Sequence, residues 1–447
     1  MMKLHTLTTL LHAPALPDEN KSCTGISIDS RTLQTGNLFI AIRGERFDGH
    51  AYLDEVAQKG ACAAVVDHTI DNAPLPLIVV PHTVQALSCL AQAWRRQFSL
   101  PFVALTGSCG KTTTKTLLAH ILAQQGATLS TQGTLNNEIG VPLTLLQLRA
   151  EHRFAVIELG ANHPREIHSL AHLVEPDIAV VTNVAPVHLE GFGTLEGVAR
   201  TKSELYEALP SKGIAILNHD DAFFPFFKKQ TAHCKTLSFG FHHNADVRAS
   251  ELGINARGFP TFTLHYRQEI CRITLPLLGQ HNVMNALAAA GAALALQIPL
   301  SVVKTGLETA QAVNKRMNKH LTFNDAVLID DTYNANPVAF AAAMDFLIQQ
   351  AGRKILVAGD MGELGHDAAH YHEKLGKQAK QKGIHHLFTV GKLSSHATKA
   401  FGENAKHFET KAALIHHLRH FITPDQIVLV KGSRSAKMEE VIEALKK

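Results

Sequence analysis

Short apolar runs alternate with amphipathic stretches along almost the whole chain. In the first hundred residues the apolar runs are 37–42, 62–67 and 75–80, and residues 83–98 carry apolar side chains at helical spacing. Apolar runs of four to eight residues between turn residues are typical of buried strands. The helical pattern stops just before Pro101. Because a proline commonly follows the end of a helix, Pro101 marks a first domain boundary.

The same alternation continues through the middle of the chain. Strands that alternate with helices predict a parallel sheet covered by helices on both faces. The strand candidates in this segment are 102–107, 154–160, 177–184 and 213–218. Between about 245 and 277 the pattern instead indicates an antiparallel hairpin, which we expect to extend that sheet. An alanine-rich helix over 279–296 and a second helix over 301–313 follow.

A third series of strands and helices begins after residue 313. Its strand candidates are 326–331, 354–360, 385–391 and 426–433, each ending in small or polar residues. The sequence therefore predicts an α/β protein of three domains, with boundaries at 1–99, 100–313 and 314–447. Ligands of open parallel sheets bind at the carboxyl ends of the strands, so we expect the chemistry at those ends.

Composition and charge narrow the class of protein. With 447 residues, 45% hydrophobic and 18% charged, the chain resembles soluble globular proteins with large cores. A net charge of +4 gives no electrostatic reason to expect nucleic acid as a partner, and the 28 histidines are scattered. His and Thr interrupt the apolar residues of the N-terminus, and no apolar stretch is long enough to span a membrane. We expect a cytoplasmic protein without membrane insertion.

Six cysteines are spread along the chain without a C-x-x-C pair or regular spacing. This pattern argues against a zinc site and a disulfide framework, and it favours a reducing compartment. The cysteines are Cys23, Cys62, Cys89, Cys109, Cys234 and Cys271.

Residues 106–115, TGSCGKTTTK, form a glycine turn between an apolar run and a helical pattern. The turn does not match the common phosphate-loop pattern G-x-x-x-x-G-K-[ST], because Leu105 stands where the first glycine should be. A strand, a glycine turn and a helix nevertheless form a typical phosphate-binding arrangement. Lys111 would reach phosphate and Thr112 would offer a hydroxyl to Mg²⁺. A turn of small residues without a ligand is the alternative. Cys109 as a redox thiol is less favoured, because no base or second cysteine is evident nearby.

Three further side chains follow strands at the same predicted edge. Glu158 ends the run 154–160, where a carboxylate would complete a nucleotide-bound Mg²⁺ site. His188 and Lys202 follow the run 177–184. Taken singly, Glu158 could cap a helix, His188 could be a satisfied loop histidine and Lys202 a solvated helix lysine. Their common placement near the loop favours a site.

With these residues in place, the sequence resembles the Mur ligase family over nearly its whole length. The phosphate loop of that family is the short form T-G-x-x-G-K-T, which Thr106 to Thr112 match; many members have Asn where Cys109 stands. The resemblance implies a Rossmann-like C-terminal domain, ATP as a substrate and two Mg²⁺ sites. It also implies that Glu158, His188 and a carbamylated Lys202 surround the second Mg²⁺.

The N-terminal stretch 27–52 resembles the UDP-binding domain of two of these ligases. Motifs at 135–146, 158–167 and 330–337, with 359–365 and 430–435, favour the member that adds a terminal dipeptide. The D-Y-A-H-T-P and D-N-P-R motifs of the ligases that add the third residue are absent from the sequence. The implied substrates are UDP-N-acetylmuramoyl-tripeptide and D-alanyl-D-alanine, joined through an acyl phosphate, with the enzyme as a monomer.

The resemblance assigns roles residue by residue. Lys111, Lys202, His188 and Glu158 would be catalytic, and Thr112, Glu158, His188 and carbamylated Lys202 would bind metal. ATP would contact Gly107, Ser108, Cys109, Gly110, Lys111, Thr112, Thr113, Asn282, Asn285, Arg316 and Asp331. The other substrates would contact Ser30, Arg31, Asp48, Gly49, His50, Asn137, Asn162, Tyr333, Asn334 and Asn336. Each of the last four ATP-binding residues also has an alternative without a ligand. Asn282 and Asn285 could pack among alanines, Arg316 could be a surface residue, and Asp331 could cap the end of a strand.

Three other functions remain open at this point. A ligase that adds the third residue, or a folate- or cyanophycin-type ligase, would share the central core. A nucleotide-dependent switch would share the loop but would not need Glu158, His188 and Lys202 together.

Overall fold

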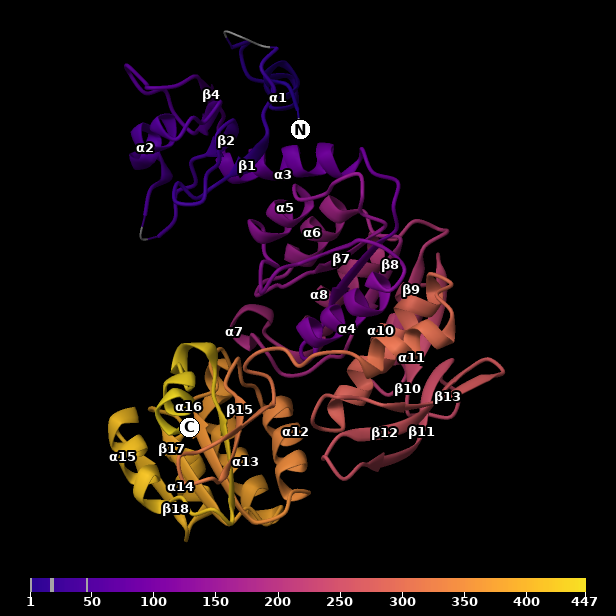
Figure 1. The fold of residues 1–447 in the computed structure, drawn as a ribbon, viewed down its shortest axis with the longest axis vertical. Helices are drawn as coiled ribbons and strands as arrows, with labels where there is room; N and C mark the ends of the chain where they lie inside the picture. Colours follow the sequence, from indigo (N-terminus) through magenta and orange to yellow (C-terminus); the bar gives the residue numbers. More distant parts are fainter. Residues whose placement is uncertain (1, 17–19, 46) are drawn as a thin grey trace.

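The computed structural model describes residues 2–16, 20–45 and 47–447, and these form three sheets with their helices (Figure 1). The N-terminal sheet is parallel, in the order β1-β2-β3-β4. Its strands are β1 (Gly25–Ser27), β2 (Asn37–Ile40), β3 (Ala63–Val66) and β4 (Leu77–Val79). The helices of this region are α1 (Leu4–Leu10), α2 (Leu53–Gln58) and α3 (Thr83–Arg95).

Helix α3 joins the N-terminal sheet to the central one (Figure 1). Its apolar face belongs to a core that runs from Leu38 of β2 to Phe102 of the central sheet. At its C-terminal end, the guanidinium of Arg95 donates hydrogen bonds to the carbonyls of Val174 and Glu175, both at 2.7 Å. These bonds satisfy carbonyl groups at the end of α6 (Glu166–Val174), which would otherwise lack partners. The two domains are thus joined by packing and by a helix cap.

The central sheet has nine strands in the order β13-β12-β11-β10-β9-β8-β5-β7-β6. Pairing is parallel from β6 to β11 and antiparallel from β11 to β13, as the hydrophobic pattern predicts. Its strands are β5 (Phe102–Thr106), β6 (Thr128–Ser130), β7 (Phe154–Glu158), β8 (Ile178–Val181), β9 (Ile214–Asn218), β10 (Lys235–Gly240), β11 (Val247–Ile254), β12 (Pro260–Tyr266) and β13 (Glu269–Thr274).

Helices cover both faces of this sheet. One face carries α4, α10 and α11, whose apolar side chains form a core with β5, β8 and β12. The other face carries α5, α6 and α8, which pack with α3. The helices are α4 (Lys111–Ala123), α5 (Gly140–Leu145), α6 (Glu166–Val174), α7 (Leu189–Phe192), α8 (Leu195–Glu207), α9 (Phe224–Gln230), α10 (His281–Ala295) and α11 (Leu300–Glu308).

The C-terminal sheet has the order β14-β15-β19-β16-β17-β18, with only β14 antiparallel to its neighbour. Separate apolar cores on its two faces make it a doubly covered α/β sheet. Its strands are β14 (Asn318–Leu321), β15 (Val327–Asp331), β16 (Arg353–Gly359), β17 (His386–Val390), β18 (Ala405–Phe408) and β19 (Gln426–Lys431). Its helices are α12 (Pro337–Ile348), α13 (Ala368–Gln381), α14 (Ser395–Phe401), α15 (Lys411–Phe421) and α16 (Glu439–Leu445).

The predicted strands are present, and the prediction missed the short or half-exposed ones. Strands β1, β6, β10, β14 and β18 lack a fully apolar run and were not predicted. Helix α11 ends at Glu308, earlier than residue 313, because the segment that follows crosses to the C-terminal sheet. Among the described residues, no helix combines the length and the apolar character required to cross a membrane.

Candidate active site

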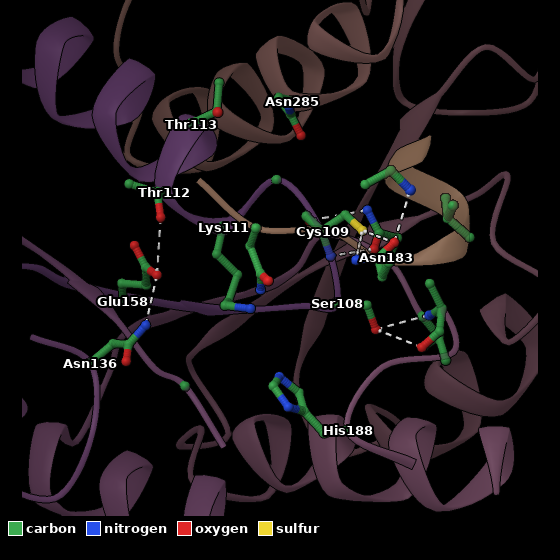
Figure 2. Close-up of a pocket in the computed structure, with 18 of the residues that line it drawn as sticks. Ser108, Cys109, Lys111, Thr112, Thr113, Asn136, Glu158, Asn183, His188 and Asn285 are labelled. Carbon is green, nitrogen blue, oxygen red and sulfur yellow. Dashed lines mark hydrogen bonds between the residues drawn. The ribbon is translucent and has the colours of Figure 1, made fainter. Parts of the chain in front are cut away.

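A cavity of about 1140 Å³ lies where the C-terminal sheet meets the carboxyl ends of the central strands. The loop after β5 and residues after β7, β8 and β9 form one side. Arg316, Asp331, Tyr333 and Lys431 of the C-terminal part form the other. Figure 2 shows the loop residues around this space, with Glu158 and His188 on opposite sides of Lys111. Two sheets therefore contribute side chains to one site, at the strand ends where the sequence predicts chemistry.

The loop backbone leaves no room for side chains at its two glycines. Gly110 has a φ of +80°, and a Cβ there would lie 2.1 Å from the Oδ1 of Asn285. A Cβ on Gly107 would lie 1.8 Å from the Oγ1 of Thr182. The ammonium of Lys111 folds back to donate to the carbonyl of Gly107 at 2.7 Å. Helix α4 begins immediately after Gly110, so its N-terminal amides and positive dipole end face the cavity.

The segment after β8 holds the loop in this shape. The amide N–H groups of Ser108 and Cys109 donate to the carbonyl and side-chain oxygens of Asn183, at 3.0 and 2.9 Å. The hydroxyl of Thr182 donates to the carbonyl of Cys109 at 2.6 Å. The prediction did not include Thr182 and Asn183, although polar residues directly after a buried strand were the available signal.

The side chain of Cys109 faces the C-terminal domain. The amide Nδ2 of Asn336 lies 3.1 Å from the Cys109 sulfur. The Oδ1 of Asn336 accepts a hydrogen bond from the N–H of Ala339 at 2.8 Å and so caps α12. Asn336, predicted to bind substrate, thus has a structural role here and ties the loop to the third domain.

Glu158 is 1% exposed and lies against the loop. Its Oε1 accepts hydrogen bonds from Thr112 Oγ1 at 3.2 Å and Asn136 Nδ2 at 2.9 Å. Its Oε2 has no hydrogen-bond partner among the described residues, and the ammonium of Lys115 lies 3.8 Å away. A buried carboxylate oxygen without a donor is unfavourable. Thr112 and Glu158 therefore fit a divalent cation, whose preferred ligands are carboxylate and hydroxyl oxygens.

Arg316 brings positive charge from the C-terminal domain to the loop. Its Nη2 donates to the Oγ1 of Thr112 at 3.0 Å, and its guanidinium stacks 4.0 Å from the ring centroid of Tyr333. This interdomain contact joins a predicted ATP-binding residue to a predicted metal ligand.

His188 and Lys202 have different environments. His188 lines the cavity, and its Nδ1 contacts the carboxylate of Glu363 from the C-terminal domain. This contact with His188 lowers the pKa of the Glu363 carboxyl. Lys202 is 3% exposed within α8 and is not part of the cavity wall. Burial, with a smaller contribution from the charge of Lys111, lowers the pKa of the Lys202 amine from 10.5 to about 7.

The predicted adenine and ribose residues line the same cavity. Asn282 and Asn285 are buried, one helical turn apart on α10, and Asn285 Nδ2 donates to Asn282 Oδ1 at 2.9 Å. Asp331 forms an ion pair of 2.5 Å with Lys431, which is itself buried and also donates to the carbonyl of Asn334. Lys431 was not singled out from the sequence, although it lies in the motif at 430–435.

The predicted substrate residues fall into two groups. Asn137, Asn162, Tyr333 and Asn334 line the large cavity, and the Oδ1 of Asn137 also accepts a hydrogen bond from an α5 amide at 2.9 Å. A second cavity of about 550 Å³ shares part of the loop with the first. Its walls include Ser108, Lys111, His188, Asn334, Asn336, Ser433, Arg434, Ser435 and Lys437.

The five N-terminal residues do not line either of these cavities. The guanidinium of Arg31 pairs with Asp29 at 2.7 Å, and Asp48 pairs with His50 at 2.6 Å. A Cβ on Gly49 would lie 2.8 Å from the backbone nitrogen of Ile42. Ser30 is buried. These residues shape turns at the strand ends of the N-terminal sheet.

Comparison with known proteins covers almost the entire chain. Residues 22–95 match the model of the Mur ligase family catalytic domain, 105–293 the Mur ligase middle domain, and 315–434 the Mur ligase glutamate ligase domain. The chain is 41% identical to UDP-N-acetylmuramoyl-tripeptide–D-alanyl-D-alanine ligase of Escherichia coli, over 99% of this chain and 98% of that one. For the ligase of the same name from Haemophilus influenzae, the identity is 40%, over 100% and 99%.

Solved structures of MurF ligases resemble this chain over nearly its whole length. The crystal structure of MurF from Acinetobacter baumannii superposes with a TM-score of 0.93 at 37% identity, covering 99% of this chain and 98% of that one. The MurF ligase of Thermotoga maritima in complex with ADP gives a TM-score of 0.85 at 27% identity, with coverage of 94% and 96%. A folylpolyglutamate synthase of Mycobacterium tuberculosis shares the fold at 15% identity, with a TM-score of 0.64, over 81% of this chain and 95% of that one.

Proposed function

This chain belongs to the Mur ligase family, and from that premise we propose how its two cavities carry out the reaction. The protein is an ATP-dependent ligase that adds D-alanyl-D-alanine to UDP-N-acetylmuramoyl-tripeptide in peptidoglycan precursor synthesis. One observation carries the proposal: the phosphate loop and the C-terminal domain contribute side chains to a single cavity. The domain boundaries proposed are 1–99, 100–313 and 314–447.

For ATP, we propose that the amides at the start of α4 and the ammonium of Lys111 hold the β- and γ-phosphates. Asn282 and Asn285 face the adenine, Asp331 the ribose, and Arg316 the phosphates. All four line the large cavity, in support of this arrangement. Arg316 acts from the third domain, so that domain must remain docked for the phosphates to be fully neutralised.

For metal, Thr112 and Glu158 would hold a first Mg²⁺, and Glu158, His188 and carbamylated Lys202 a second. Bound Mg²⁺ neutralises phosphate charge during phosphoryl transfer. Two observations support the assignment. The Oε2 of Glu158 has no hydrogen-bond partner in the described part of the chain, and the pKa of Lys202 is lowered. A neutral amine can attack CO₂ and lose a proton to give a carbamate oxygen ligand, whereas an ammonium repels cations.

For the other substrates, we propose that the N-terminal domain binds the UDP moiety and that Asn137 and Asn162 contact the muramyl peptide. The dipeptide would enter the smaller cavity beside Asn334 and Asn336. Its carboxylate suits the basic side chains of Arg434 and Lys437, which line that cavity. Its amine would then attack an acyl phosphate held near Lys111, and phosphate would leave.

The enzyme is proposed to be a cytoplasmic monomer. Two observations support that compartment. ATP is supplied in the cytoplasm, and the six cysteines, all within the described residues, form no disulfide. Residues of the central and C-terminal domains of one chain complete the cavity without a second copy.

The test is a phosphate-release assay with each substrate omitted in turn. We expect release only when ATP, the UDP-linked tripeptide and D-alanyl-D-alanine are all present. Release that needs neither peptide substrate would instead favour a nucleotide switch. For Lys202, the alanine variant should lose activity and short carboxylic acids should restore part of it. Full activity of that variant would exclude the carbamate.

A further inference from the structure

Two cysteines that are distant in the sequence meet in the core of the N-terminal domain. The sulfur atoms of Cys23 and Cys62 lie 2.8 Å apart, and each residue is 1% exposed. Across the described residues, which include all six cysteines, this is the only pair of thiols within hydrogen-bonding distance. The sequence showed no C-x-x-C pattern because the fold, not the local spacing, brings these two together.

Backbone hydrogen bonds fix both residues. The N–H of Cys23 donates to the carbonyl of Met2 at 2.8 Å, beside the bridge between Lys3 and Ser22. The N–H of Cys62 donates to the carbonyl of Asn37 at 2.8 Å, one residue before β3. The backbone bonds fix the two Cα positions, and burial of both side chains in one apolar core keeps the sulfurs facing each other.

We propose that Cys23 and Cys62 are a site of reversible disulfide formation, in which a small peroxide oxidises the pair. A disulfide bond measures about 2.05 Å, so the sulfurs need to approach by less than about 1 Å. Burial at 1% exposure favours a small oxidant over a bulky disulfide reagent. In a reducing compartment the pair stays as two thiols, and thiol reductants reverse the bond.

The chemistry assigns different roles to the two sulfurs. A hydrogen bond from Cys23 lowers the pKa of Cys62, and the same contact raises the pKa of Cys23. The Cys62 thiolate attacks one peroxide oxygen, the O–O bond breaks, and Cys62 becomes a sulfenic acid. The Cys23 sulfur then attacks the Cys62 sulfur, the S–O bond breaks and water leaves. In total, two thiols and one hydrogen peroxide give one disulfide and two waters.

The bond would enclose the part of the chain predicted to hold UDP. Residues 23 and 62 bracket Ser30, Arg31 and the turn at 48–50, while neither cysteine lines the ATP cavity. We therefore expect a disulfide to stabilise the N-terminal domain without changing turnover at saturating substrates. Closing a loop of this length restricts the unfolded chain and should raise the thermal midpoint of that domain by at least ~5 °C.

To test for this disulfide, the full chain is treated with hydrogen peroxide and the remaining thiols are blocked by alkylation. The peptides are then mapped by mass spectrometry. We expect one linked peptide joining Cys23 and Cys62, lost on reduction, together with the rise in thermal midpoint. Cys89→Ser, which removes an exposed cysteine, should give the same linked peptide, and Cys62→Ser should give none. The wild-type map does not depend on either variant folding.

Peroxide that oxidises Cys89 but leaves Cys23 and Cys62 as alkylated thiols would overturn the proposal. So would irreversible oxidation of Cys62 without a linked peptide. Turnover that is unchanged at saturating substrates while the linked peptide forms supports the placement of the bond outside the active site. Because the linked peptide is scored without any ligase assay, its absence would leave the proposed ligase function untouched.

Discussion

Replacing Lys202 with methionine should make this protein more stable while removing its activity. Lys202 lies in α8 with 3% of its surface exposed, and its Nζ is 6.0 Å from the ring centroid of Phe192. Methionine has a similar unbranched chain and fills much of the same volume without a charge. The substitution therefore removes a buried amine and adds no large cavity.

The magnitude follows from the pKa of Lys202. Burial lowers this pKa from 10.5 in the unfolded chain to about 7 in the folded protein. Between these two values the unfolded chain binds more protons, so the stability of the wild type rises with pH from 7 to 10.5. At pH 7 the difference corresponds to about 4 kcal/mol of destabilisation by the lysine. The gain from Lys202→Met should approach that value at pH 7 and nearly vanish at pH 10.5.

Denaturant unfolding of both proteins in CO₂-free buffer, at pH 7 and again near pH 10, measures this difference. The phosphate-release assay on the same samples should show that the methionine variant is inactive. A variant no more stable than the wild type at pH 7, or a gap that stays constant with pH, would refute the claim that Lys202 is a desolvated amine. Lys202→Arg, which keeps the charge, should show no gain and serves as the control.

Three further substitutions test the loop, the third domain and the core. Gly110→Ala should abolish ATP-dependent phosphate release, because the added Cβ would clash with Asn285. Gly383 is the control: its φ of +78° is nearly equal, but a Cβ there would meet open space. Gly383→Ala should therefore cost only about 1 kcal/mol of stability and keep activity. Lys431→Met should raise the KM for ATP about tenfold or more in an assay at varied ATP. The substitution leaves the carboxylate of Asp331 without the ammonium that pairs with it. Tyr206→Phe removes a buried hydroxyl that donates to a β9 carbonyl at 3.0 Å, and urea unfolding should show a loss of about 1 kcal/mol with normal kinetics.

The hydrophobic pattern predicted the central strands well because their side chains are buried on both faces. Strand β5 is fully buried along its length, and its apolar run leads directly into the loop. Edge strands such as β6 and β18 have only three or four residues, of which one in each strand is buried. So short a pattern does not distinguish a strand from a turn. The order of the nine strands also lies outside the reach of local patterns, because pairing joins residues far apart in the chain.

By itself the sequence determined the glycine turn before a helix, the strand-end carboxylate and the family, since each depends on residue types at short spacing. Tertiary structure decided which of those residues act together. In the fold, the guanidinium of Arg316 donates a hydrogen bond to Thr112 and the carboxylate of Glu363 contacts His188. Burial of Lys202 lowers its pKa to about 7. The fold also brings the thiols of Cys23 and Cys62 together. The physical reason is that desolvation and contacts between domains depend on the whole fold, whereas a phosphate loop depends on a few consecutive residues.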